Sequence, residues 1–169
     1  MELEKKCGED AVSGEPYVFY KVHYQDDEFI DLFLTVVSRG FNEFHDFIKQ
    51  FSLSINKEEF LRNLQMTNIY FNIHEDHSYP DENMVIWSNV FTTKHNLGKV
   101  VDLYRVFSPT YSIPYLIYSF EQNKYFIIEE MDSDQYESKY IPKIQEFGTT
   151  EFMDLLGMMK DLIEKYEEE

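Results

Sequence analysis

The sequence contains a single cysteine, Cys7, so no disulfide can form within the chain. A lone cysteine in a chain of 169 residues is typical of a reducing compartment rather than of a secreted disulfide scaffold. No stretch approaches the roughly 18 apolar residues that a membrane span requires. The N-terminal residues also lack the apolar segment of a secretory signal. We therefore expect a cytoplasmic protein that does not enter a membrane.

Glycine and basic side chains are also scarce, and this argues against several classes of binding site. The six glycines form neither a Rossmann G-x-G-x-x-G nor a P-loop motif, and no G-x-S-x-G nucleophile elbow occurs. The 15 Lys and Arg are outnumbered by 32 Asp and Glu, which gives a formal net charge of −17. Such a charge repels nucleic acids and anionic lipid surfaces and attracts a basic partner. The sequence therefore predicts a non-catalytic protein without a cofactor.

Aromatic residues, by contrast, are abundant. The chain has 15 Phe, 13 Tyr and one Trp, and each buried aromatic ring removes roughly 150–250 Å² of surface from water. A chain with this apolar content can fold around a sizeable core, and its length fits one domain. Residues 1–15 are charged and lack periodicity, so we expect a flexible acidic leader there. Residues 16–169 should form a single α+β domain.

Apolar residues spaced by three and four predict helices in the first third and at the end of the chain. Over residues 30–51 these side chains share one helical face, and Gly40 inside this run could divide it into two helices or kink it. A further helix is expected from Asn56, because Glu59 stands three residues later in a capping-box position. The last helix should begin near residues 149–150, which supply its N-cap.

Alternating apolar and polar residues predict strands through most of the rest of the chain. The short link Glu121–Lys124 is typical of a hairpin loop, and Pro114 favours a strand start or a sheet edge. We therefore predict an α+β fold, with an antiparallel sheet of about five to six strands and helices packed on one face. The expected strands are Tyr17–Tyr24, Asn68–His74, Met84–Thr92, Val100–Phe107, Ile113–Phe120 and Tyr125–Met131.

Few residues suggest chemistry. His74 and His77 stand among four acids and could bind a divalent metal, but residues three apart share a face only in a helix. Because Pro80 and the polar composition favour a loop, we expect a solvated acidic loop and no metal site. Asp102, in an apolar strand, is the better candidate for a perturbed carboxylate, and we expect it to face solvent or to pair with Arg105.

The acidic side chains are concentrated toward the two ends of the chain. Residues 1–85 carry 17 acids and seven bases, and residues 125–169 carry 13 acids and four bases. Residues 86–124 carry only two acids and four bases. Tyrosines are dense in the central sheet region, where they suit a partner surface or a half-exposed sheet face. These tyrosines are Tyr104, Tyr111, Tyr115, Tyr118 and Tyr125.

With no catalytic constellation, protein binding is the most economical function. We expect an inhibitor or immunity-type protein that neutralises a basic partner such as a nuclease toxin, because opposite charge accelerates association. A subunit or scaffold of a larger assembly is an alternative. The residues expected to contact the partner are Asp26, Asp27, Glu28, Glu75, Asp76, Asp81, Glu82, Tyr111, Tyr115, Glu129, Glu130, Asp132 and Asp134.

One local resemblance offers another alternative. The segment Ser108-Pro-Thr-Tyr111-Ser-Ile-Pro114-Tyr-Leu116 resembles the strand–turn–strand motif S-x-S-Y-x-V-P-V-L of the autophagy E2-like enzyme, which conjugates the ubiquitin-like autophagy modifier. Residues 150–153 are similar to those that follow that family's catalytic His-Pro-Cys. In this chain Gln-Glu-Phe at residues 145–147 stands where His-Pro-Cys would be. The resemblance therefore implies an E2-like conjugation factor or a degenerate relative of one. Without the cysteine, which thioester chemistry needs, the relative would be non-catalytic.

Overall fold

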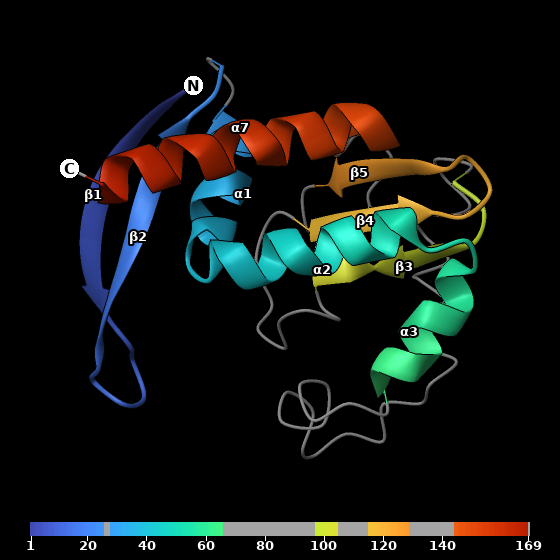
Figure 1. The fold of residues 1–169 in the computed structure, drawn as a ribbon, viewed down its shortest axis with the longest axis horizontal. Helices are drawn as coiled ribbons and strands as arrows, with labels where there is room; N and C mark the ends of the chain where they lie inside the picture. Colours follow the sequence, from blue (N-terminus) through green and yellow to red (C-terminus); the bar gives the residue numbers. More distant parts are fainter. Residues whose placement is uncertain (26–27, 66–96, 105–114, 129–143, 169) are drawn as a thin grey trace, which may run out of the picture.

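The structure is a computed structural model that describes residues 1–25, 28–65, 97–104, 115–128 and 144–168. These residues form four helices and two antiparallel sheets (Figure 1). The elements in chain order are β1 (Glu2–Glu9), β2 (Pro16–His23), α1 (Glu28–Ser38), α2 (Phe41–Leu53), α3 (Lys57–Gln65), β3 (Val100–Asp102), β4 (Tyr115–Ser119), β5 (Lys124–Ile128), β6 (Ile144–Gly148) and α7 (Thr149–Glu167).

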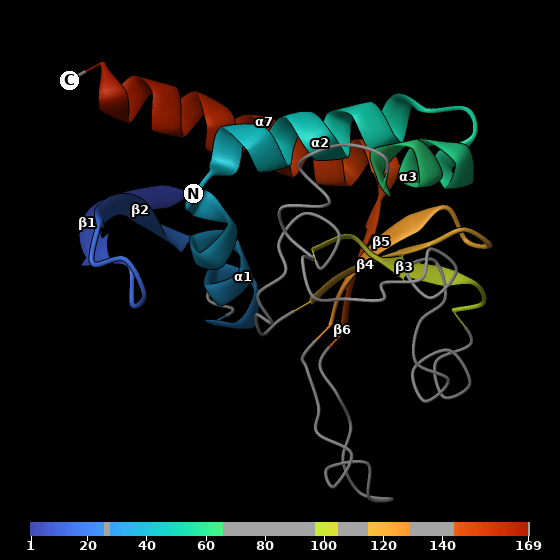
Figure 2. The same ribbon diagram turned by 90° about the horizontal axis from the view of Figure 1, so that it is seen from below.

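The α+β class is confirmed, but the described strands form two sheets rather than one of five to six strands. β1 pairs with β2, and the second sheet has the order β3-β4-β5-β6, with every neighbouring pair antiparallel. The helices are divided between the two sheets. α1 packs along β2, whereas α2 and α7 lie side by side against the four-stranded sheet (Figure 2).

The prediction of a flexible leader over residues 1–15 misses a strand. Residues 2–9 form β1, in register with residues 16–23 of β2. The sequence does not indicate this strand, because most of its side chains are charged. Two of them, Glu4 and Lys6, lie on one face and form an ion pair at 2.8 Å. The turn after β1 is organised by Asp10, whose carboxylate accepts hydrogen bonds from two amides two and three residues later and from Arg39. These bonds hold the pKa of Asp10 well below its usual value.

Most predicted helix boundaries are confirmed. Gly40 has a φ of 78°, which favours glycine, and it separates α1 from α2. Asn56 caps α3, because its Oδ1 accepts a hydrogen bond of 3.0 Å from the Glu59 amide. The N-cap of α7 is Gly148 rather than Thr149 or Thr150, because the preceding residues form the unexpected strand β6.

The strand predictions have a mixed outcome. The strands predicted at 17–24, 113–120 and 125–131 correspond to β2, β4 and β5, and β4 and β5 form the expected hairpin. The strand predicted at 100–107 ends at Asp102. The predicted strands 68–74 and 84–92, and Pro114, lie outside the described residues.

Aromatic rings fill the space between the four-stranded sheet and its two helices. Phe51 of α2 meets Tyr118 of β4 edge-on, with ring centroids 5.0 Å apart. Phe152 of α7 stacks on Tyr125 of β5 at 4.7 Å. All four side chains are buried. Tyr118, Tyr125 and also Tyr104 therefore belong to the core, and the suggestion that they form a half-exposed or partner-binding face is wrong.

We predict that Phe51→Ala lowers the free energy of unfolding by about 3–5 kcal/mol, because it leaves a cavity among these rings. Leu53→Ala, only two residues along α2, is the matched control, since Leu53 is 74% exposed and its loss should change stability by less than about 0.5 kcal/mol. Chemical denaturation of both variants measures the difference. Equal effects would show that the aromatic cluster does not anchor α2.

Candidate protein-binding surfaces

Most of the residues predicted to bind a partner lie outside the described part of the chain. Glu28 is described, and it is an exposed side chain in the first turn of α1. Tyr115 begins β4, but its side chain is not described. The predicted residues outside the described ranges are Asp26, Asp27, Glu75, Asp76, Asp81, Glu82, Tyr111, Glu129, Glu130, Asp132 and Asp134, together with His74 and His77.

A row of polar side chains on α1 occupies the outer edge of β2. Asp31, Thr35 and Ser38 follow one another at helical spacing. They accept hydrogen bonds from the amides of residues 24, 22 and 20 at 2.7, 3.0 and 2.9 Å, respectively. The Ser38 hydroxyl also donates to the carbonyl of residue 20. The helix therefore satisfies a strand edge that would otherwise need another strand.

Beside this row lies an open groove of about 940 Å³, formed by both strands of the hairpin and by α1. Its apolar lining includes Phe19 and Leu32, and its acidic lining includes Glu28 and Asp31. The Oδ2 atom of Asp31 lies 3.9 Å from His23 Nδ1. Lys6 and Lys21 also line the groove, so its apolar walls and its charges of both signs suit an amphipathic segment of a partner.

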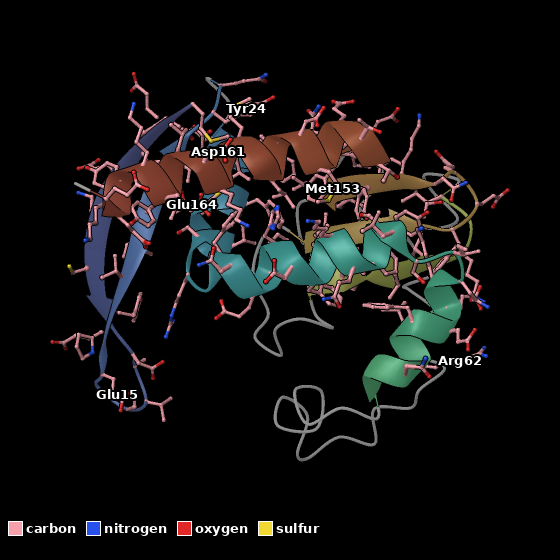
Figure 3. The ribbon with its side chains drawn as sticks, in the orientation of Figure 1. Glu15, Tyr24, Arg62, Met153, Asp161 and Glu164 are labelled. Atoms are coloured by element: carbon pink, nitrogen blue, oxygen red, sulfur yellow. The ribbon has the colours of Figure 1, made fainter. Side chains whose placement is uncertain are left out.

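The exposed side of α7 carries an acidic strip that the sequence analysis did not identify. Its carboxylates recur at helical spacing, and Met158 stands in the middle of them with 46% of its surface exposed. Figure 3 labels Asp161 and Glu164 on this helix. The signal was the complement of the apolar stripe that predicted α7, since many of the positions outside the stripe are acidic, although Lys160 and Lys165 also stand there. We name as the acidic strip Glu151, Asp154, Asp161, Glu164, Glu167 and Glu168, all of which are exposed.

The turn between α2 and α3 also exposes apolar side chains. Leu53 is 74% exposed and Ile55 is fully exposed. The turn is held by Lys57, whose ammonium donates to the carbonyls of residues 52 and 54 at 3.3 and 3.1 Å. Burial lowers the pKa of Lys57. The hydroxyl of Tyr125 forms a hydrogen bond with the side chain of Ser52. Burial raises the pKa of Tyr125.

Three further candidates have defined surroundings. Cys7 is exposed on β1 instead of lying in a flexible leader. Asp102 is buried, with 4% of its surface exposed, so it does not face solvent, and its predicted partner Arg105 lies outside the described residues. Within the described ranges, no three His, Cys, Asp or Glu side chains are grouped so that they could hold a metal ion.

Comparison with known proteins gives no relative: no family model, no curated protein and no solved structure matches this chain. Among the helices in the described part of the chain, none combines the length and apolarity needed to cross a membrane.

The row on α1 predicts a specific energetic effect. Thr35→Val keeps the shape of the side chain but leaves the residue 22 amide without its acceptor, so it should lower the free energy of unfolding by about 1–3 kcal/mol. Thr35→Ser keeps the hydroxyl and should retain most of the stability. Amide hydrogen exchange at residue 22 should accelerate in the valine variant alone. Unchanged exchange there would mean that the helix does not protect this strand edge.

Proposed function

We propose that this protein is a non-catalytic protein-binding module that engages a basic partner through its carboxylate surface, as an inhibitor or immunity-type protein would. The observation that carries the proposal is the acidic strip on α7, with exposed Met158 among its carboxylates. The carboxylates of such a surface attract the Lys and Arg side chains of an approaching partner by long-range electrostatics. In the bound complex, Met158 adds one apolar contact.

The packing of α7 supports this role because it fixes the strip before binding. The opposite side of the helix buries Phe152, Leu156 and Met159 in the main core. From Glu151 to Glu168 the strip extends roughly 25 Å at the rise of an α-helix. Carboxylates held on a packed helix lose little freedom when a partner binds, so less of the interaction free energy is spent on ordering them.

Glu28 and Asp31 add two carboxylates at the groove beside α1, which Lys6 and Lys21 also line. These carboxylates follow the predicted contacts at residues 26–27 in the sequence. A basic partner with an amphipathic segment could therefore place apolar side chains in the groove and a basic side chain beside Glu28 or Asp31. The acidic strip and the groove together provide the electrostatic attraction and apolar contact that the proposal requires.

We predict that Asp154→Lys combined with Asp161→Lys weakens binding of the basic partner by roughly tenfold or more, since opposed charges become like charges. The partner would first be isolated on immobilised protein at low salt and identified by mass spectrometry. Affinity of the purified pair would then be measured across a salt series, and it should fall as salt rises.

The matched control is Glu43→Lys combined with Asp46→Lys, which changes the net charge equally on the exposed side of α2. This control should weaken binding much less than the α7 variant. Equal losses would show that only total charge matters and would contradict the assignment to the strip. Binding without salt dependence would contradict the electrostatic proposal itself.

We propose as a second candidate a non-catalytic relative of the autophagy E2-like enzyme, on the strength of the sequence resemblance described above. Residues 145–147, where that family has His-Pro-Cys, belong to β6, and residues 150–153 begin α7 immediately afterwards. Phe147, in the position of the cysteine, is buried, and its ring lies 5.6 Å from that of Phe152. A buried aromatic in place of a nucleophile is compatible with binding a modifier but not with a thioester.

This second candidate predicts that a labelled ubiquitin-like autophagy modifier binds the purified protein non-covalently. The complex should survive gel filtration but disappear on denaturing gels, with or without ATP and an activating enzyme. A band that persists on a denaturing gel and is sensitive to thiols would contradict the non-catalytic assignment. Absence of binding at high protein concentration would eliminate this candidate and leave the basic-partner proposal untouched.

A further inference from the structure

The N-terminal hairpin has one edge that is occupied and one that is open. The outer edge of β2 is filled by the α1 side chains, which hydrogen-bond the amides of residues 20, 22 and 24. In the described part of the chain, the sheet formed by β1 and β2 has no third strand. The outer edge of β1 therefore presents backbone donors and acceptors that a further strand can pair.

The register identifies which residues face the open edge. Tyr20 turns its backbone groups toward α1, away from β1, so the pair it forms with Lys5 is a non-hydrogen-bonded one. Lys5 must then turn its own amide and carbonyl outward. By the two-residue period of a strand, Leu3 and Cys7 do the same.

The side chains of β1 are complementary to a second, antiparallel copy of β1. In a two-fold arrangement centred on Lys5, Glu4 of each copy lies opposite Lys6 of the other, and Leu3 lies opposite Cys7. Residues 2–8 of β1 are then paired with residues 2–8 of the other copy. Opposite charges and apolar pairs directly across strands are favourable, and a two-stranded hairpin becomes part of a four-stranded sheet, which is more stable on its own.

We propose that two copies of this chain associate by antiparallel pairing of their β1 strands about a two-fold axis at Lys5. The outward backbone groups of Leu3, Lys5 and Cys7 then form the hydrogen-bonded pairs of the new ladder. This proposal concerns the backbone edge of β1, which lies close to the C-terminal end of the acidic strip, and it does not depend on which partner the strip binds.

Charge on the two faces of the new sheet is locally balanced despite the large net charge of each chain. On one face, Glu4 and Lys6 form two cross-strand pairs. On the other face, the two Lys5 side chains meet. Each Lys5 lies directly opposite Tyr20 on the neighbouring strand β2. The ring of Tyr20 packs on that of Tyr166 in α7, with centroids 5.6 Å apart. The acidic C-terminal turn of α7 therefore lies over the face that carries the two lysines.

A charge-complementation experiment tests the arrangement. Alone, Glu4→Lys places lysine opposite lysine and Lys6→Glu places glutamate opposite glutamate, so each variant should dimerise roughly tenfold or more weakly than the wild type. An equimolar mixture of the two restores both opposite-charge pairs between unlike chains. Native mass spectrometry should show heterodimers in excess over either homodimer, and sedimentation equilibrium should show recovered affinity.

Each substitution also removes the ion pair between Glu4 and Lys6 within its own chain, and mixing the two variants does not restore that pair. A recovery of affinity in the mixture must therefore come from contacts between the chains. A wild-type chain that stays monomeric at every concentration would overturn the proposal. So would a wild-type dimer whose variants show no preference for heterodimers. Circular dichroism of each variant verifies that β1 and the remaining elements still form.

A disulfide tests the register without altering charge. Leu3→Cys should link to Cys7 of the other copy under mild oxidation, because hydrogen-bonded antiparallel pairs have Cα atoms about 5.5 Å apart, within disulfide range. Wild type should not link, since the two Cys7 residues are four positions apart along the strands, roughly 13 Å. Leu3→Cys combined with Cys7→Ser should not link either. A covalent wild-type dimer, or none from Leu3→Cys, would overturn this register.

Discussion

The stacking of Phe152 on Tyr125 is the contact on which the rest of the structure depends. It joins the last helix to the middle of the four-stranded sheet, and both side chains are completely buried. Phe51 completes the cluster from α2. Because these rings fix the rotation of α7 about its axis, they also decide which side of α7 faces solvent. The position of the acidic strip on the protein surface is therefore set by the packing of the core.

The same packing separates charge from apolar surface. The described core contains few polar side chains, and several of these make hydrogen bonds within it. Ser119 donates to the carbonyl of Leu97, and Tyr118 donates to Asn123 at 2.7 Å. The carboxylates of the described residues, by contrast, lie mostly on outward faces, where water screens their mutual repulsion. With Asp102 as a buried exception, the acidic side chains of the described residues are kept out of the interior, where an unpaired charge would be costly.

Features that depend on local sequence could be predicted, whereas those that depend on distant partners could not. The division at Gly40, the cap at Asn56 and the hairpin of β4 and β5 all follow from local residues. β1 could not be recognised, because its apolar content is low and its pairing is set by β2 and the Asp10 turn. The separation into two sheets follows from α1 occupying the β2 edge, which no spacing within α1 reveals. Of the predicted partner contacts, Glu28 lines the groove. The α7 strip was not predicted, because the spacing of apolar residues in α7 identifies the buried side of the helix and not a function of its exposed side.

The contact between Tyr20 and Tyr166 has a consequence for the order in which the protein folds on the ribosome. The hairpin and α1 are neighbours in sequence, so their hydrogen bonds can form early, while synthesis continues. Tyr20 is fully covered only when α7, at the other end of the chain, has emerged and packed. Until then, the side chain of Tyr20 on the assembled hairpin lacks the cover that Tyr166 provides.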